Sequence, residues 1–317
     1  MYKKIGFVFI ICIFLFSCGQ PTASGKLQNV GLLVPETIDD QVWGMNGYKG
    51  LLKIQSELKV DVFYKEGMTE EVAIRNAIDE FQAQDVNLIF GHGNEYITIF
   101  NKIAKEYPNI HFVLFNGSVE GDNLTSLNFN SHAMGFFAGM VAGEMTKSGR
   151  VGVLAAFEWQ PEINGFYEGA SFQNDHVNVD IRYVQDWNDS EKAMPLLEEM
   201  ISAGTDIIYV AGDGYNVSVI ERLKEEGLFA IGFVSDQSDL GKTTVLTSTV
   251  QHIDTLYELV ASQFNDGKLE SGELYYDFQD GVITMGNFSP LVDENFQLKL
   301  EKDIEEYKKS GQLPNQL

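Results

Sequence analysis

Three tryptophans and a set of short polar side chains are the residues of this 317-residue chain best suited to chemistry, and that chemistry is binding. Trp43, Trp159 and Trp187 each follow a predicted strand, in segments that also carry Asp, Asn, Gln or His. An aromatic plane beside directional hydrogen-bonding groups suits a flat polar ligand such as a base or a sugar. The alternative is that the tryptophans pack against the edges of the fold and that Asp and Asn cap helices. The pattern predicts binding by Asp40, Trp43, His92, Asn94, Asn116, Trp159, Asp213, Tyr215, Asn216 and Asp236.

Motifs for catalysis and for cofactors are absent from the sequence. It holds no His-Glu-x-x-His, no Walker loop and no Gly-x-Ser-x-Gly. The five histidines lack the spacing of metal ligands, and no clustered aspartates offer the metal site that a nucleoside hydrolase would need. Gly91-x-Gly93 and Gly212-x-Gly214 lack the third glycine of a dinucleotide fingerprint and are interpreted as tight turns. The sequence therefore predicts no enzyme, no cofactor and no metal.

The elements that must position the binding residues alternate between short apolar runs and stretches of helical period. This alternation predicts a doubly wound α/β fold with parallel sheets covered on both faces. The predicted strands are Val30–Val34, Val60–Tyr64, Leu88–Phe90, His111–Phe115, Ser126–Phe129, Val151–Ala155, Val179–Tyr183, Ile207–Val210, Phe229–Phe233 and Val245–Ser248. The predicted helices are Trp43–Glu57, Glu70–Gln82, Tyr96–Tyr107, Ala133–Thr146, Ile163–Phe172, Glu191–Ile201, Val217–Glu226 and Ile253–Asn265.

An internal echo, that is, the same order of elements in both halves of the chain, predicts two lobes rather than one sheet. The order strand, Gly-x-Gly, Asn, helix, strand occurs over Leu88–Asn116 and again over Ile208–Asp236. The alternative is that the two halves are not a duplication, because any strand-helix-strand unit has this order of elements. Two similar lobes would face each other across a cleft, where ligands bind beyond the carboxyl ends of the strands.

The N-terminus has the pattern of a secretory signal with a lipid attachment site. Lys3 and Lys4 precede an apolar run from Ile5 to Phe16, which is about half the roughly 20 residues needed to span a bilayer. The segment from Leu15 to Cys18 resembles a lipobox, although its Phe16 is larger than usual. Because Cys12 lies inside the apolar run, Cys18 is the one cysteine of the exported part. The sequence predicts a protein lipid-anchored at Cys18 on the extracytoplasmic face of the cell membrane; the alternative is an ordinary signal peptide.

The large excess of acidic over basic residues restricts the classes of molecule that the protein can bind. The chain has a net charge of −24, and removal of residues 1–17 takes away two lysines and no acid, which gives −26. Nucleic acid is held through phosphate neutralisation by Lys and Arg, so a nucleic acid partner is excluded. Adhesion to anionic headgroups is disfavoured for the same reason, which leaves the acyl chains as the membrane attachment.

Several segments resemble a known family. Ala133–Gly139, Thr146–Gly152, Ser235–Gln237 and Val245–Ser248 are similar to markers of the basic membrane protein type of substrate-binding lipoproteins, also called PnrA-like. The resemblance runs from Val30 to Leu291. It implies a periplasmic-binding type I fold, no catalysis, and binding of a purine nucleoside for an ABC importer.

Other segments resemble one subgroup of this family. They are similar to the Med subgroup, which is named as a positive regulator of competence, over Val42–Gly44, Tyr48–Leu51, Phe90–Gly93, Ala211–Asn216 and Ser289–Asp293. This resemblance implies a regulatory lipoprotein whose ligand is altered or absent.

The ligand residues that the family implies are only partly kept. Asp40 and Trp43 take the Asp and aromatic positions of the family's first motif, but Asn116 and Val234 stand where the family has Asp, and Gln251 replaces a lysine. Each lost charge-assisted hydrogen bond is worth about 1.5–3 kcal/mol, so we expect an ordinary nucleoside to bind more weakly here than in the family. Two functions remain open: a binding protein for a small polar, nucleoside-like ligand of an ABC importer, and a surface regulator. The predicted ligand set also includes Phe166 and Gln251.

The expected domain organisation follows the two lobes. A signal peptide covers 1–17 and a tether 18–28, the N-terminal lobe 29–130 with 249–282, and the C-terminal lobe 131–248 with 283–317. No Pro- or Ser-rich linker separates the halves, which favours lobes joined by several short crossing segments.

Overall fold

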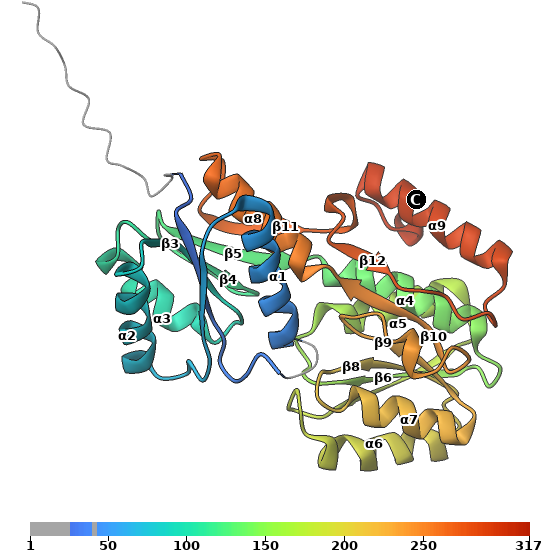
Figure 1. The fold of residues 1–317 in the computed structure, drawn as a ribbon. Helices are drawn as coiled ribbons and strands as arrows, with labels where there is room; N and C mark the ends of the chain where they lie inside the picture. The colour runs from blue at the N-terminus through green and yellow to red at the C-terminus, as the bar shows by residue number, and fades with distance from the viewer. Residues whose placement is uncertain (1–25, 40–42) are drawn as a thin grey trace, which may run out of the picture.

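Two α/β lobes, each built on a six-stranded sheet, make up the part of the chain that the computed structural model describes, residues 26–39 and 43–317 (Figure 1). Cys18 and Asp40 therefore lie outside the described residues. The N-terminal sheet contains β1 (Asn29–Leu33), β2 (Val62–Lys65), β3 (Val86–Gly91), β4 (His111–Phe115), β5 (Leu124–Phe129) and β11 (Gly272–Tyr276). The C-terminal sheet contains β6 (Arg150–Ala155), β7 (Asn178–Tyr183), β8 (Ile207–Ala211), β9 (Phe229–Gly232), β10 (Val245–Gln251) and β12 (Ile283–Met285).

The two sheets have the same topology. Their strand orders are β11-β5-β4-β3-β1-β2 and β12-β10-β9-β8-β6-β7, so that β3 and β8 hold equivalent places. All pairings are parallel except that of β10 with β12. Central strands such as β4 and β8 are buried along their whole length, as parallel strands covered on both faces must be. The predicted class, two doubly wound α/β lobes, is confirmed.

Helices cover both faces of each sheet. In the N-terminal lobe α1 (Trp43–Leu58) and α8 (Ile253–Asn265) pack on one face, and α2 (Glu71–Gln82) and α3 (Tyr96–Ile103) on the other (Figure 1). In the C-terminal lobe the two faces are covered by α4 (Ser131–Met145) with α5 (Pro161–Gln173), and by α6 (Ser190–Ser202) with α7 (Asn216–Glu226). Among the described residues, no helix is both long and apolar enough to cross a membrane.

Three elements had not been predicted. The edge strand β11 alternates exposed and half-buried residues, with Tyr275 67% exposed, and β12 has three residues, so neither carries a strong apolar pattern. The helix α9 (Glu294–Ser310) does carry one, because Phe296, Leu300, Ile304 and Tyr307 recur at helical spacing and are buried. This pattern was readable from the sequence and was missed.

The chain crosses between the lobes three times: after β5, after β10 and after β11. The boundary expected at 130/131 falls between β5 and α4, whereas the one expected at 248/249 falls inside β10, which continues to Gln251. Two of the crossings are bonded to each other, because the Asn130 side-chain amide donates to Asp277 and to Tyr307 Oη, both at 2.8 Å. The hydroxyl of Tyr307, on α9, also donates to Asp277. Through Tyr307, the C-terminal helix α9 therefore holds the first and third crossings together.

The close packing of α4 against α5 depends on glycine. Almost the whole of α4 is buried, from Ala133 to Gly143. A Cβ atom on Gly139 would lie 2.2 Å from the carbonyl oxygen of Phe166, and one on Gly169 would lie 1.9 Å from that of Phe136. The two helix backbones therefore touch directly, and a methyl group at either position would have to push them apart.

Candidate functional site

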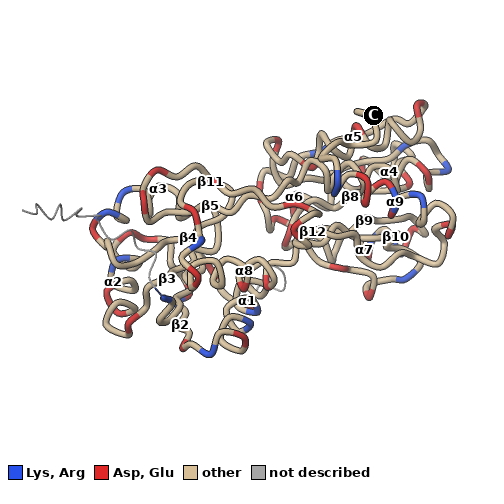
Figure 2. Tube along the Cα trace, turned by 90° about the horizontal axis from the view of Figure 1, so that it is seen from above, with Lys and Arg blue, Asp and Glu red and all other residues tan. Residues whose placement is uncertain are grey.

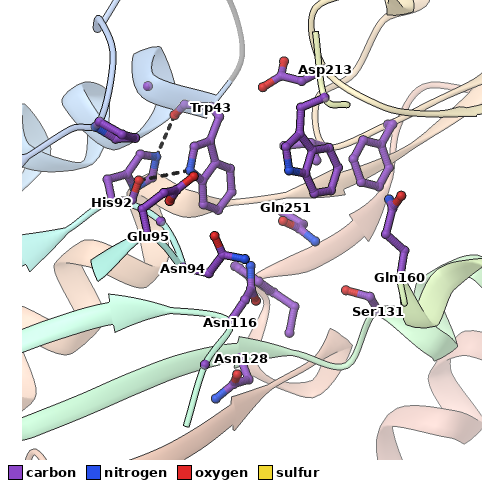
Figure 3. A pocket seen from close by; sticks show the side chains of 18 of the residues that line it. Trp43, His92, Asn94, Glu95, Asn116, Asn128, Ser131, Gln160, Asp213 and Gln251 are labelled. Atoms are coloured by element: carbon purple, nitrogen blue, oxygen red, sulfur yellow. Dashed lines mark hydrogen bonds between the residues drawn. The ribbon is translucent and has the colours of Figure 1, made fainter. Parts of the chain in front are cut away.

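A cavity of about 550 Å³ is lined by residues of both lobes. Its N-terminal side is formed from α1, the loops after β1, β2, β3 and β4, and the strands β5 and β11. Its C-terminal side is formed from the loops after β6, β7, β8 and β9, the end of β10 and the first turns of α4 and α5. Figure 3 shows side chains from both lobes converging on this space. The polar and aromatic lining residues include Trp43, His92, Asn94, Glu95, Asn116, Asn128, Ser131, Trp159, Gln160, Glu162, Trp187, Asp213, Gln251, Glu273 and Tyr275.

The place of the cavity follows from the parallel sheets. Because the strands of one sheet run in the same direction, their carboxyl ends and the loops after them meet at one edge. His92 and Asn94 follow β3, and Asp213 follows the equivalent strand β8. The two Gly-x-Gly turns of the internal echo therefore occupy matching positions in the two lobes, one on each side of the cavity.

Trp43 is held in place by His92. The indole Nε1–H of Trp43 donates to the backbone carbonyl of His92 at 3.3 Å, and the Nε2 of His92 lies 2.7 Å from the backbone carbonyl of Trp43 (Figure 3). The two rings stack with their centroids 4.4 Å apart and 16° between their planes, and Phe115 meets both rings edge-on. Through these contacts one wall of the cavity is preorganised.

His92 is neutral and has both ring nitrogens occupied. Because a carbonyl can only accept, Nε2 carries the proton and Nδ1 accepts from the Tyr257 hydroxyl at 2.8 Å. Complete burial lowers the pKa of His92 from 6.5 to about 4. Gly47 on α1 permits this placement, since a Cβ there would lie 2.7 Å from the His92 ring. His92 therefore positions Trp43 and offers a ligand no positive charge.

The C-terminal lobe supplies a second aromatic wall. Phe157 and Trp159 stack at 5.6 Å between ring centroids, and Trp187 meets both edge-on, at 5.4 and 5.9 Å. Trp159 is 57% exposed although it is one of the largest apolar side chains of the protein. All three tryptophans line the cavity, one from the N-terminal lobe and two from the C-terminal lobe. A flat molecule could thus be held between walls that belong to different lobes.

Acidic groups dominate the charge of the cavity. Five acidic residues line it, and among the described lining residues none is Lys or Arg; the five are Glu36, Glu95, Glu162, Asp213 and Glu273. Burial raises the pKa of Glu162 from 4.5 to about 7, and burial also raises the pKa of Glu95. Hydrogen bonds from Ser118 and Tyr275 lower the pKa of Glu273.

Two residues of the cavity have left-handed backbone. Asn116 has a φ of 55°, which Asn tolerates, and Val234 has a φ of 63°, which is uncommon for a β-branched residue. The backbone carbonyl of Val234 accepts from the Gln251 N–H at 2.9 Å, which ties this strained loop to the second crossing between the lobes. Backbone strain of this kind clusters where ligands bind.

Seven residues of the predicted ligand set line the cavity: Trp43, His92, Asn94, Asn116, Trp159, Asp213 and Gln251. Four others do not line it. Phe166 and Tyr215 are fully buried in the C-terminal lobe, where Phe166 stacks on Tyr209; Asn216 begins α7 with its side chain buried. The carboxylate of Asp236 accepts from the Ser238 and Asn287 backbone and so organises its own loop.

Other lining residues were missed by sequence reasoning. Glu273 and Tyr275 lie on β11, which had not been predicted, and Asn128 and Ser131 lie at the first crossing between the lobes. Glu162 has a signal that could have been used, because this acid lies in the segment that follows β6, directly after a proline and just before the predicted helix. In the described ranges, no group of three or more His, Cys, Asp or Glu could hold a metal ion.

Comparisons with known proteins identify relatives along the whole described chain. The model of a family described as ABC transporter substrate-binding protein PnrA-like matches residues 27–317. The chain is 50% identical over 314 residues to a Bacillus subtilis (strain 168) protein named transcriptional activator protein med, and the match covers 99% of each chain. It is 26% identical over 258 residues to a purine-binding protein of Brucella abortus (strain 2308), covering 80% of this chain and 73% of that relative.

Solved structures agree with these relatives. A crystal structure of a transcriptional activator of the comK gene from Bacillus halodurans is 49% identical, with a TM-score of 0.85, and the match covers 90% of this chain and 99% of that one. An ABC transporter solute-binding protein from Aeropyrum pernix K1 is 19% identical, with a TM-score of 0.71, and the match covers 92% of this chain and 82% of that one. This likeness confirms the predicted periplasmic-binding fold.

Proposed function

This chain belongs to the PnrA-like family of ABC transporter substrate-binding proteins, a family of binding proteins rather than enzymes, and we propose that it is a ligand-sensing surface lipoprotein that promotes competence. The observation that carries the proposal is the cavity of about 550 Å³ with all three tryptophans in its walls. Its volume lies within the roughly 300–1,000 Å³ of sites for small molecules. The ligand is a flat, polar molecule, and its binding draws the lobes together into a form that a membrane partner recognises.

Regulation through DNA contact does not suit this chain. Relatives at 49–50% identity are named as transcriptional activators, which supports a regulatory role. However, the net charge of −24 opposes the phosphate backbone of DNA, and the first 18 residues have the pattern of a lipoprotein signal. We therefore place the protein outside the cell membrane, so that its effect on transcription passes through a partner that spans the membrane.

A second candidate function is delivery of the ligand to an ABC importer. The family match and the purine-binding relative favour it. The cavity, however, has Asn116 and Val234 where the family has Asp, and Gln251 where it has a lysine, so that a nucleoside would lose charge-assisted partners. Deleting the genes of the presumed importer distinguishes the two functions, because uptake fails in the second case while competence persists in the first.

The first test is Trp159→Ala. Because Trp159 is 57% exposed, its removal should leave the melting temperature unchanged. Loss of one stacking surface should weaken ligand binding about tenfold, measured by calorimetry, and should lower a competence reporter in cells. Tyr167→Ala is the matched control, since Tyr167 is 52% exposed, lies on α5 and does not line the cavity. An unchanged reporter despite weakened binding would refute the sensing role.

The second test is Cys18→Ala, which concerns the anchor. The variant should lose acylation at Cys18, so that the protein either accumulates uncleaved or appears in the medium. Fractionation of cells followed by immunoblotting measures this result. A mature-size product that stays in the membrane fraction would mean that another segment attaches the protein.

A further inference from the structure

We propose that the ligand of the cavity is a flat organic cation, such as a protonated arylalkyl amine, rather than an anion or a neutral nucleoside. The proposal rests on the ligand-binding role proposed above and names the chemical class that the cavity selects. Three features of the described lining support it: the sign of its charges, the burial of Glu162, and the aromatic walls.

The charges of the lining have one sign and come from both lobes. Glu36, Glu95 and Glu273 belong to the N-terminal lobe, and Glu162 and Asp213 belong to the C-terminal lobe. Among the described lining residues none is Lys or Arg, and His92 is neutral with both ring nitrogens bonded. Acidic residues are also spread over both lobes in Figure 2. A cavity lined by one sign of charge concentrates ligands of the opposite sign and repels carboxylates and phosphates.

Glu162 is the buried acid of this site. Its residue is 4% exposed, yet it lines the cavity. Its Oε1 accepts from the Gln160 side-chain amide at 2.8 Å, and that amide also donates to the Ala211 carbonyl at 3.1 Å, so Gln160 holds the carboxyl at the cavity wall. No cation of the described chain is among the groups that shift the pKa of Glu162. A carboxylate buried without a positive partner is costly, and a cationic ligand would supply that partner.

The aromatic walls suit the same ligand. A cation over an aromatic face is attracted by the ring quadrupole, most strongly over Trp. Trp159 and Trp187 lie in the same lobe as Glu162, and Trp43 faces the cavity from the other lobe. An arylalkyl amine could therefore place its ring between indoles and its ammonium group at Glu162.

The test uses ligands that share a ring and differ in charge. Tryptamine, tryptophol and indole-3-acetate present a cation, a neutral alcohol and an anion on one indole; phenethylamine, 2-phenylethanol and phenylacetate repeat the series on a benzene ring. Calorimetry of the purified protein at pH 8, where Glu162 is ionised, should give amine affinities at least tenfold above those of the alcohols and no binding of the acids. Adenosine and guanosine serve as neutral nucleosides.

Two variants of α5 assign the charge effect to one residue. Glu162→Gln should lower the affinity for the amine about tenfold and leave that for the alcohol unchanged. Glu168→Gln removes the same charge from the same helix outside the cavity and should change neither. Alcohols or nucleosides that bind as tightly as the amines would overturn the charge inference and keep the proposed ligand binding. No binding by any amine, alcohol, acid or nucleoside would overturn both.

Discussion

Gly139→Ala should lower the free energy of unfolding by about 3 kcal/mol, although alanine is the better helix former by about 1 kcal/mol. The expected sign is opposite to the propensity because the new Cβ would lie 2.2 Å from the backbone carbonyl oxygen of Phe166. A backbone oxygen in a helix cannot rotate away as a side chain can. The helices α4 and α5 must then separate, and the apolar contacts along their shared surface weaken.

Urea unfolding followed by circular dichroism measures this change. Asn164→Ala is the matched control, since Asn164 is exposed on α5 and alanine there should be neutral or slightly stabilising. If Gly139→Ala raised the unfolding midpoint as Asn164→Ala does, the direct backbone contact between α4 and α5 would be refuted.

His92→Ala should cost about 3 kcal/mol of stability and also weaken ligand binding by tenfold or more. The stability loss comes from a fully buried ring with a hydrogen bond at each nitrogen. The binding loss comes from Trp43, whose indole loses both its stacking partner and the fixed position of its acceptor. His92 acts through Trp43, so it is a positioning residue of the cavity.

His111→Ala separates these two effects. His111 is also buried in the N-terminal lobe, where its Nε2 lies 2.8 Å from Thr125 Oγ1, but it begins β4, at the end of the sheet away from the cavity. We expect a similar loss of stability and no change in the affinity for the tightest-binding probe of the charge series. Equal affinities in the two variants would show that His92 does not position the cavity wall.

Acid should destabilise the protein partly through these two histidines. Burial lowers the pKa of each from 6.5 to about 4, so that between these values the unfolded chain binds more protons than the folded one. Stability therefore falls as the pH drops from 6.5 to 4, by up to about 3 kcal/mol for each histidine. Glu162 has the opposite effect. Its raised pKa keeps it protonated in the folded chain between pH 4.5 and 7, so its contribution to stability falls as the pH rises through this range. Urea unfolding at a series of pH values measures this effect. Between pH 6.5 and 4 the free energy of unfolding should fall less steeply with pH for His92→Ala than for the wild type.

Much of the site was predictable because strand ends determine it. His92 and Asp213 could be assigned from the sequence, since each follows an apolar strand and parallel strands bring their carboxyl ends to one edge. Glu273 and Tyr275 could not, because their strand is a half-exposed edge whose pairing with β5, more than a hundred residues earlier, decides that it is a strand. Sequence periodicity reports local burial, and this pairing is not local.

The architecture and the charge of the protein can be derived from its amino-acid sequence alone. The alternation of apolar runs and helical stretches specifies two α/β lobes because each element must bury its apolar face, and the acidic composition predicts that nucleic acid is not a partner because charge counts need no structure. The roles of individual side chains follow from their contacts in the folded chain. His92 was predicted as a ligand residue on its type and place, but its contacts with Trp43 and Tyr257 make it a neutral support for the wall. Glu162 was not singled out in the sequence, and the structure buries it in the cavity wall with its carboxyl held by Gln160. Burial and hydrogen-bond partners come from residues distant in sequence, and these set the protonation and orientation of each side chain.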